Sequence, residues 1–259
     1  MKSQGVAMFC YDSNIKYSDI CNFNIEQVRQ HISANITIYT DQNTAKRLPH
    51  NVDIRITKLP DVNIRYFRTL SQQLPWYNLN RSSIFSEPPY DKTLLIDVDY
   101  IIYSNFLKHV LASEYDFLCY RRCKDMSGTY AADKEQVGGS IIPFCWGTVL
   151  LISKSQICDK LGVLFENIKT HWKWYRNMYR IKASTFRNDY ALSIACSMLF
   201  GQRPSNHYIP GVMLCINDEA SVALGRTGLT YSFAKEGKIY KHDIKGVDVH
   251  VLNKEMSYE

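Results

Sequence analysis

Two acidic residues separated by one apolar residue, Asp97 and Asp99, follow a short apolar run in the segment DKTLLIDVDYIIYSN, residues 91–105. The run is rich in Leu and Ile and is bounded by polar turn residues, which predicts a buried β-strand. Because side chains alternate along a strand, both carboxylates are expected on the same face. Two like charges that close repel one another unless a cation lies between them. The pair therefore predicts a site for Mg²⁺ or Mn²⁺, which prefer hard oxygen ligands.

The alternative is that the two acids only begin a turn. A solvated turn does not require an apolar stretch directly after it, yet Tyr100, Ile101 and Ile102 follow Asp99. Open α/β sheets bind their ligands beyond the carboxyl ends of central strands, where this pair would lie. We therefore favour the metal site.

The composition is that of an ordinary globular protein of 259 residues, of which 46% are hydrophobic and 22% charged. No apolar run approaches the ~18–20 residues that span a membrane, and the N-terminal apolar run is too short for a signal peptide. We expect a cytoplasmic protein with no membrane partner. The net charge of +6 suits an anionic partner.

Eight cysteines are scattered along the chain, and several lie within apolar runs such as VAMFC and GVMLCI. This pattern is typical of reduced, buried cysteines in a cytosolic protein. Cys119 and Cys123 are four residues apart, but no second pair and no paired histidines complete a zinc-binding set. The spacing of the cysteines therefore predicts no zinc site.

Strand-like and helix-like segments alternate, which predicts an α/β fold with a mostly parallel central sheet flanked by helices. The expected strands are 5–11, 35–41, 52–60, 91–99, 115–121 and 147–153, and the expected helices are 18–33 and 75–85. The polar, glycine-tipped segment 121–139 predicts a mobile loop. Residues 154 to about 200 are expected to be mainly helical and the part that follows irregular, because it contains Pro204, Pro210 and Gly211.

A strand–helix–strand half followed by a hydrophobic D-x-D motif resembles the GT-A fold glycosyltransferases. The resemblance covers most of the chain. It implies one domain, residues 1–259, with a nucleotide-binding half over 1–105 and a helical and irregular acceptor-binding half over 106–259. It also implies an enzyme that transfers a sugar from a nucleotide-sugar donor, with UDP as the nucleotide that the family favours and Mn²⁺ or Mg²⁺ as the ion.

The resemblance implies roles for residues of the first half. Asp97 and Asp99 would hold the ion that bridges the donor diphosphate, and Asp97 would also reach the ribose. Arg81 lies on the expected helix before the motif, where such enzymes often keep an arginine near the nucleotide or its phosphates. Glycosyl transfer requires stabilisation of a diphosphate leaving group, which an ion and basic side chains can supply.

The resemblance extends to two segments of the second half. VDVHVLNK, residues 247–254, is similar to a C-terminal His-x-x-x-Lys element, which would make His250 a third metal ligand and Lys254 a diphosphate contact. FRNDYALSIA, residues 186–195, resembles the acidic segment that faces sugar and acceptor, which makes Asp189 the candidate catalytic or sugar-orienting carboxylate. The glycogenin-like H-x-x-G-x-x-K-P-W pattern is missing, so retention or inversion of configuration stays open.

Each assignment has an ordinary alternative. Asp189 could cap a helix, and His250 could be a plain edge-strand histidine. Arg81 could lie on the surface and Lys254 in a solvated tail. Haloacid-dehalogenase-like phosphatases also carry a hydrophobic D-x-D, but usually at the start of the chain and with Thr or Val where this sequence has Ile101. A non-catalytic binding module is a third alternative.

The segment KTHWKWYRNMYRIK, residues 169–182, suggests an acceptor. On a helix its basic residues form one stripe and its aromatic residues the next. Basic residues attract phosphates and flat aromatics accept unstacked bases, although such aromatics can equally enter the core. Small stand-alone enzymes of this kind resemble bacteriophage glycosyltransferases that modify 5-hydroxymethylcytosine in DNA, within the host cytoplasm. Hydroxymethylated DNA is the acceptor we expect, with glycan or protein acceptors left open. The basic stripe comprises Lys169, Lys173, Arg176 and Arg180, and its aromatic neighbours are Trp172, Tyr175 and Tyr179.

Overall fold

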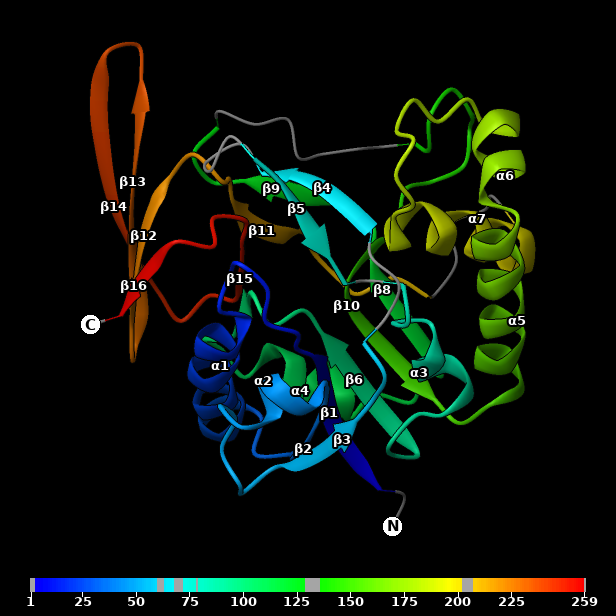
Figure 1. Cartoon of the computed structure of the whole chain (residues 1–259), viewed down its shortest axis with the longest axis horizontal. Coiled ribbons are helices and arrows are strands. Elements are labelled where there is room, and N and C mark those ends of the chain that lie inside the picture. Colours follow the sequence, from blue (N-terminus) through cyan, green and yellow to red (C-terminus); the bar gives the residue numbers. More distant parts are fainter. Residues whose placement is uncertain are drawn as a thin grey trace.

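A six-stranded sheet forms the centre of the computed structural model, which describes residues 3–59, 63–67, 72–77, 79–128, 136–201 and 207–258. The strand order is β3-β2-β1-β6-β10-β8 (Figure 1). The first four of these strands are parallel, and β10 is antiparallel to both β6 and β8. The expected α/β fold with a mostly parallel sheet is confirmed. The strands are β1 Gln4–Phe9, β2 Asn35–Thr40, β3 Asp53–Ile56, β6 Lys92–Ile96, β8 Phe117–Tyr120 and β10 Trp146–Ser153.

Helices pack on this sheet through their apolar faces. The expected first helix is α1, Tyr17–His31, which buries Ile25 and Val28 in the main core. The expected helical region after residue 154 is also confirmed: α5 covers Gln156–Thr170, α6 covers Trp172–Met178 and α7 covers Asn188–Phe200. Here α7 packs on β10, and α5 packs on α7. The shorter helices are α2 Gln42–Ala45, α3 Ser83–Ser86 and α4 Phe106–Leu111.

The helix expected over 75–85 is wrong. Pro75 lies instead in β5, Gln72–Trp76, which pairs with β4, Asn63–Phe67, as a two-stranded antiparallel ribbon. Such an edge position tolerates a proline, which cannot donate a ladder hydrogen bond. Among the residues described in this part of the chain, only α3 is helical, and Arg81 lies in the turn before it.

The irregular structure expected after about residue 200 is also wrong for residues 207–258, which are mostly strand. Pro204 lies outside the described residues. Two short sheets form here, with orders β7-β15-β11-β9 and β14-β13-β12-β16. The β13–β14 hairpin turns at Glu236 and Gly237, which both have positive φ, 52° and 74°; two positive φ values in a two-residue loop are the geometry of the type I′ turn that hairpins favour. The bounds are β7 Tyr100–Ile101, β9 Cys123–Asp125, β11 Met213–Ile216, β12 Ser221–Gly225, β13 Gly228–Lys235, β14 Lys238–Lys245, β15 Val249–Val251 and β16 Met256–Tyr258.

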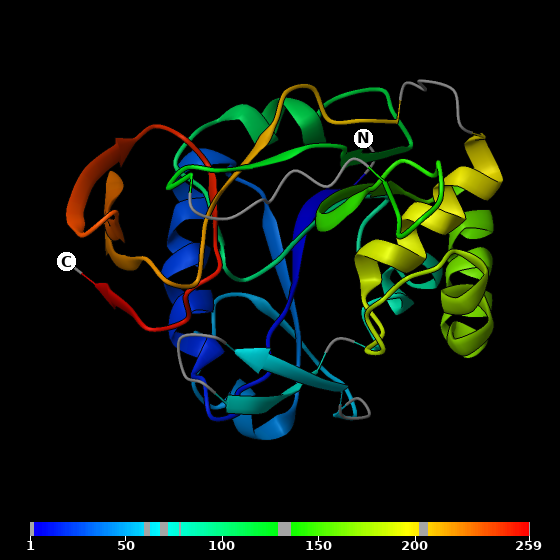
Figure 2. The same ribbon diagram turned by 90° about the horizontal axis from the view of Figure 1, so that it is seen from above.

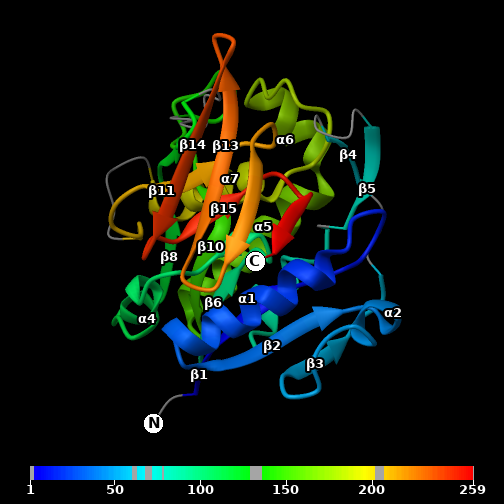
Figure 3. The same cartoon turned by 90° about the vertical axis from the view of Figure 1, so that its left-hand side faces the viewer.

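The sheet containing β12–β14 lies across α1 and its hairpin projects from the molecule (Figures 2 and 3). Ile20 of α1 belongs to the same buried cluster as Val222 and Tyr231 of that sheet. The loop expected over 121–139 contains β9, and its residues 129–135 lie outside the described part of the chain. Within the described residues, no helix is long and apolar enough to cross a membrane.

Gly162 of α5 provides a test of the packing between α5 and α3. A Cβ on this residue would lie 2.7 Å from the Cβ of Phe85, so the helices would have to separate. Replacing a helical glycine by alanine ordinarily stabilises a helix by about 1 kcal/mol. We expect Gly162→Ala to destabilise the protein by about 1–3 kcal/mol instead, as overpacked core substitutions do, measured by urea unfolding. Val163→Ala, at the neighbouring exposed position, is the control and should be close to neutral; a stabilised Gly162→Ala variant would contradict this packing.

Candidate active site

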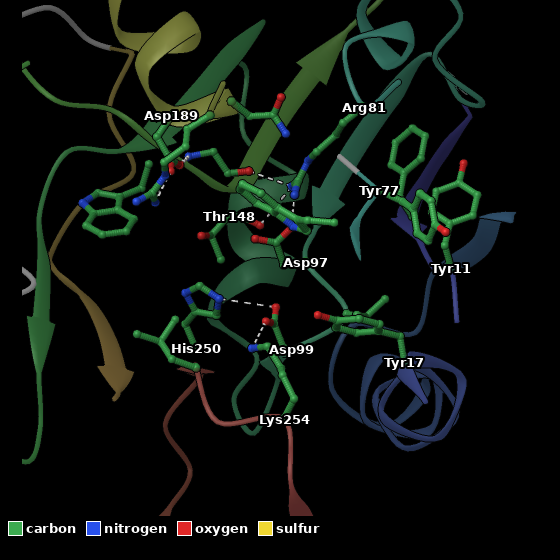
Figure 4. A pocket seen from close by; sticks show the side chains of 18 of the residues that line it. Tyr11, Tyr17, Tyr77, Arg81, Asp97, Asp99, Thr148, Asp189, His250 and Lys254 are labelled. Carbon is green, nitrogen blue, oxygen red and sulfur yellow. Dashed lines mark hydrogen bonds and ion pairs between the residues drawn. The ribbon is translucent and has the colours of Figure 1, made fainter. Parts of the chain in front are cut away.

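A pocket opens beyond the carboxyl ends of β1 and β6, and Figure 4 shows how its side chains are distributed. Tyrosines lie at one end, acidic and basic side chains fill the centre, and Asp189 lies on the far side from the tyrosines. Both halves of the chain contribute to this pocket. The tyrosines at the aromatic end are Tyr11, Tyr17 and Tyr77. The charged residues that line the pocket are Arg81, Asp97, Asp99, Arg187, Asp189, His250 and Lys254.

Asp97 and Asp99 lie in a turn, because β6 ends at Ile96 and the amide of Tyr100 donates to the carbonyl of Asp97 at 3.0 Å. The prediction that strand alternation places both carboxylates on one face is therefore wrong. Their carboxylates converge nevertheless. The carboxylate oxygens of Asp97 and Asp99 and the ring nitrogen of His250 that could bind a metal ion all lie within 4.8 Å of one another. A turn and a metal site were alternatives in the sequence analysis, but this geometry is compatible with both.

Asp99 is held between two basic side chains. It forms an ion pair with Lys254, and its Oδ1 lies 3.3 Å from Nε2 of His250. Burial alone would raise the pKa of Asp99, but the charges of Lys254 and His250 outweigh it and hold the pKa well below its ordinary value. The carboxylate is therefore ionised at neutral pH.

Strand pairing brings His250 and Lys254 next to Asp99. β15 pairs antiparallel with β7, His250 opposite Tyr100, and the amide of Val251 donates to the carbonyl of Asp99 at 2.9 Å. Lys254 Nζ also donates to the carbonyl of Val251 at 2.7 Å. The lysine side chain is 4% exposed, so it does not belong to a solvated tail.

Arg81 lies in the pocket wall with its side chain 14% exposed. Its guanidinium pairs with the carboxylate of Asp97 and donates to the carbonyl of Gly147 at 2.6 Å. Burial lowers the pKa of Arg81 to about 10, against the opposing charges of Asp189 and Asp99, so that the side chain stays protonated at neutral pH. It is therefore not a surface arginine.

Asp189 lies in the first turn of α7, but its carboxylate accepts hydrogen bonds from two residues outside that helix. Oδ1 accepts from the amide of Gly147 at 2.9 Å, and Oδ2 accepts from Arg187 at 2.7 Å. Those contacts direct the carboxylate towards β10 and the pocket. A helix cap would accept from amides of its own helix, so these bonds do not support the capping alternative.

The aromatic end was missed by the sequence analysis. The hydroxyl of Tyr11 lies 2.8 Å from Thr57 Oγ1 and accepts from Asn80 at 2.7 Å, and its ring meets that of Tyr77 edge-on with centroids 6.2 Å apart. Tyr11 directly follows the first strand, where open α/β sheets bind ligands, and that position was an available signal. Tyr77 gave none, because the ribbon containing β5 was itself not foreseen.

The continuous basic stripe expected over 169–182 is wrong. α5 ends at Thr170 and α6 begins at Trp172, so the four residues do not share one helix. Lys169 donates to Glu166 and to the carbonyl of Leu79. Arg180 lies beyond α6 with a φ of 52°.

The aromatic residues of this segment mostly pack inward. Trp172 meets the ring of Phe186 edge-on at 5.4 Å, and Tyr175 is buried. Trp174 is the exception, with 58% of its surface exposed. The alternative that these aromatic side chains enter the core therefore holds for Trp172 and Tyr175.

No protein-family model and no curated protein matches this sequence. Among solved structures, the chain is similar to the galactosyltransferase LgtC, in complex with donor and acceptor sugar analogs, with a TM-score of 0.49 and 11% identity over 85% of this chain and 75% of that one. It is also similar to the glycosyltransferase GlyE of Streptococcus pneumoniae, with a TM-score of 0.41 and 16% identity over 80% of this chain and 45% of that one. For mouse xyloside xylosyltransferase 1 the TM-score is 0.44 and the identity 7%, over 86% and 88% of the two chains.

A double-mutant cycle tests the buried charge pair. Asp99→Asn leaves the ammonium of Lys254 without its carboxylate, so we expect a loss of about 3 kcal/mol of unfolding free energy at pH 7. Lys254→Met should also destabilise, and the double variant should lose clearly less than the sum of the two, as measured by urea unfolding.

The pH dependence of that coupling follows from the lowered pKa of Asp99. The stabilisation should be fully present above the unfolded-state pKa of about 4 and should be lost as pH falls through the folded-state value. Additive losses at pH 7 would show that the two side chains do not act as a pair.

Proposed function

We propose that this chain is a metal-dependent glycosyltransferase that moves a sugar from a nucleotide-sugar to a hydroxyl acceptor. The observation that carries this proposal is the convergence of Asp97, Asp99 and His250, three side chains that could bind a metal ion. The largely enclosed cations Arg81 and Lys254 lie beside them. A divalent ion and fixed cations are the groups that stabilise a departing diphosphate.

The three side chains that could bind the ion fit Mn²⁺ or Mg²⁺. Two carboxylates offer hard oxygen atoms and the imidazole offers one nitrogen, a combination that suits Mn²⁺ in particular. When bound, such an ion would supply positive charge to the β-phosphate of the donor. Asp97 and Asp99 would orient it, and Lys254 would add a cation on the same side.

The aromatic end of the pocket would hold the nucleoside. Tyr11, Tyr17 and Tyr77 gather there and present ring surfaces on which a base and ribose can pack. A diphosphate extending from this end would reach the charged centre. A uridine diphosphate sugar is the donor that we propose.

Asp189 would act on the donor sugar. Its oxygens accept from the Gly147 amide and from Arg187, and these bonds hold the carboxylate in one orientation. A carboxylate so held would suit orientation of sugar hydroxyls and stabilisation of an oxocarbenium-like centre.

The ion dependence gives the first test. Mn²⁺-supported hydrolysis of a UDP-sugar without acceptor should stop in EDTA and should fall by ~100-fold or more in Asp99→Asn, the scale of losing one strong electrostatic contact. Circular dichroism would establish that the variant is folded at the assay temperature. Asp243→Asn, on the exposed β14, is the control and should keep full activity.

Turnover that is unaffected by EDTA and by Asp99→Asn would contradict the proposal. Release of phosphate from simple phosphomonoesters, with sugar nucleotides left intact, would instead favour a phosphatase. Binding of UDP without any turnover would favour a non-catalytic module.

The acceptor that we propose is 5-hydroxymethylcytosine in DNA. Support comes from the net charge of +6 and from the exposed Lys173, Trp174 and Arg180, although Lys169 no longer contributes. Sugar should appear on hydroxymethylated DNA, and not on plain DNA or simple glycans. Lys173→Glu with Arg180→Glu should weaken DNA binding for every sequence and flatten its salt dependence by ~1 per lost contact.

Lys108→Glu on α4 is the matched charge reversal, and donor hydrolysis should survive in all these variants. Modification of glycans alone, unchanged by the reversals, would eliminate the DNA acceptor while leaving the glycosyltransferase proposal standing.

A further inference from the structure

Three cysteines that are far apart in the sequence meet in the core behind the pocket. Cys119 lies on β8, Cys145 directly precedes β10 and Cys196 lies on α7. Their sulfur atoms all lie within 4.8 Å of one another, and no more than 2% of any of the three residues is exposed. We call these residues the cysteine cluster.

His207 is fixed beside the cysteine cluster by backbone pairing. The amide of Cys119 donates to the carbonyl of His207 at 3.0 Å, and the amide of Ile209 donates to the carbonyl of Cys119 at 2.8 Å. The imidazole stacks on Phe200 with ring centroids 4.3 Å apart and is one of the groups that lower the pKa of the Cys145 thiol. His207 is therefore a neighbour of Cys145, although its nitrogen atoms do not lie within 4.8 Å of all three sulfur atoms.

Ser193 couples Cys145 to α7. The amide of Cys145 donates to Ser193 Oγ at 2.7 Å, and that hydroxyl donates to the carbonyl of Asp189 at 2.6 Å. Ser193 and Cys196 are three residues apart, so they share one face of the helix. Hydrogen bonds thus fix the backbone at Cys119 and at Cys145, two of the three cysteines.

The thiols differ in their electrostatics. Burial raises the pKa of Cys119 and of Cys196, whereas hydrogen bonds from those two thiols hold the pKa of Cys145 well below its ordinary value.

We propose that Cys119, Cys145, Cys196 and His207 bind one Zn²⁺ as a structural site. Sulfur atoms bound to one tetrahedral zinc at ~2.3 Å lie about 3.8 Å apart, so the three sulfur atoms need only a small contraction. The imidazole of His207 would have to approach them to complete the site. Binding would release one proton from each thiol that is still protonated, and the imidazole would bind as its neutral form. The site would brace the start of α7 and with it Asp189.

Two other accounts of the cluster are weaker. A disulfide could join only two of the three sulfur atoms and would leave the third unexplained. Apolar packing alone explains a single buried thiol such as Cys158, whose thiol donates to the carbonyl of Asp116 at 3.3 Å. It does not explain the gathering of three cysteines and a histidine from four separate segments.

Elemental analysis of the full-length protein tests this proposal. Protein expressed with added zinc and dialysed against EDTA should retain about one zinc ion per chain. Cys145→Ala should retain none, and Cys158→Ala, which removes an equally buried thiol, should retain one. Asp99→Asn should also retain one, which separates this site from the carboxylate pocket.

Cobalt substitution provides a readout that needs no variant. Protein expressed with Co²⁺ in place of zinc should show near-ultraviolet thiolate-to-cobalt absorption, which carboxylate ligands cannot give. Zinc-free protein together with the lack of that absorption would overturn the site. Equal zinc retention by Cys145→Ala would overturn it as well.

Discussion

A carboxylate buried at the end of a central strand is the constraint on which much of this structure depends. Asp99 is only 12% exposed at its side chain, and an isolated ionised carboxylate at that depth would be very costly. The charges of Lys254 and His250 offset this cost. His250 lies on β15, and Lys254 lies between β15 and β16. The β7–β15 pairing is therefore both an element of the fold and the device that assembles the site.

A second set of contacts fixes the opposite wall of the pocket. Gly147 of β10 accepts from Arg81 through its carbonyl and donates to Asp189 through its amide. One backbone unit thus positions a cation and a carboxylate relative to each other. If the cysteine cluster binds zinc, the same wall is braced from behind through Ser193 and α7. Such a rigid surround suits a site that stabilises developing charge without reorganising.

Local sequence patterns predicted the parts of the fold that local physics decides. The helix α1 follows from apolar periodicity, and the strand before Asp97 and β10 follow from short continuous apolar runs. The pattern around Pro75 was misleading, because proline suits both the first turn of a helix and an edge strand. The interruption of the helix at His171 has no strong local signal, since neither glycine nor proline occurs there.

Long-range proximity was the part that the sequence could not supply. Asp97 and Asp99 were found from their spacing, but the approach of His250 and Lys254 rested on a resemblance and became physically explicable only through the β15 pairing. The cysteine cluster joins residues 119, 145 and 196, whose spacing resembles no zinc motif, so a search by spacing excluded what the fold brings together.

Coupled binding of ion and nucleotide tests the central claim most directly. UDP would be titrated calorimetrically into the wild-type protein with and without saturating Mn²⁺. This experiment needs no acceptor and no mutant protein. Because ion and diphosphate would neutralise each other in one pocket, the account predicts that Mn²⁺ tightens UDP binding by about 10-fold or more, equivalent to about 1.4 kcal/mol of coupling free energy. Equal affinity under the two conditions would contradict a metal-bridged nucleotide site at Asp97, Asp99 and His250.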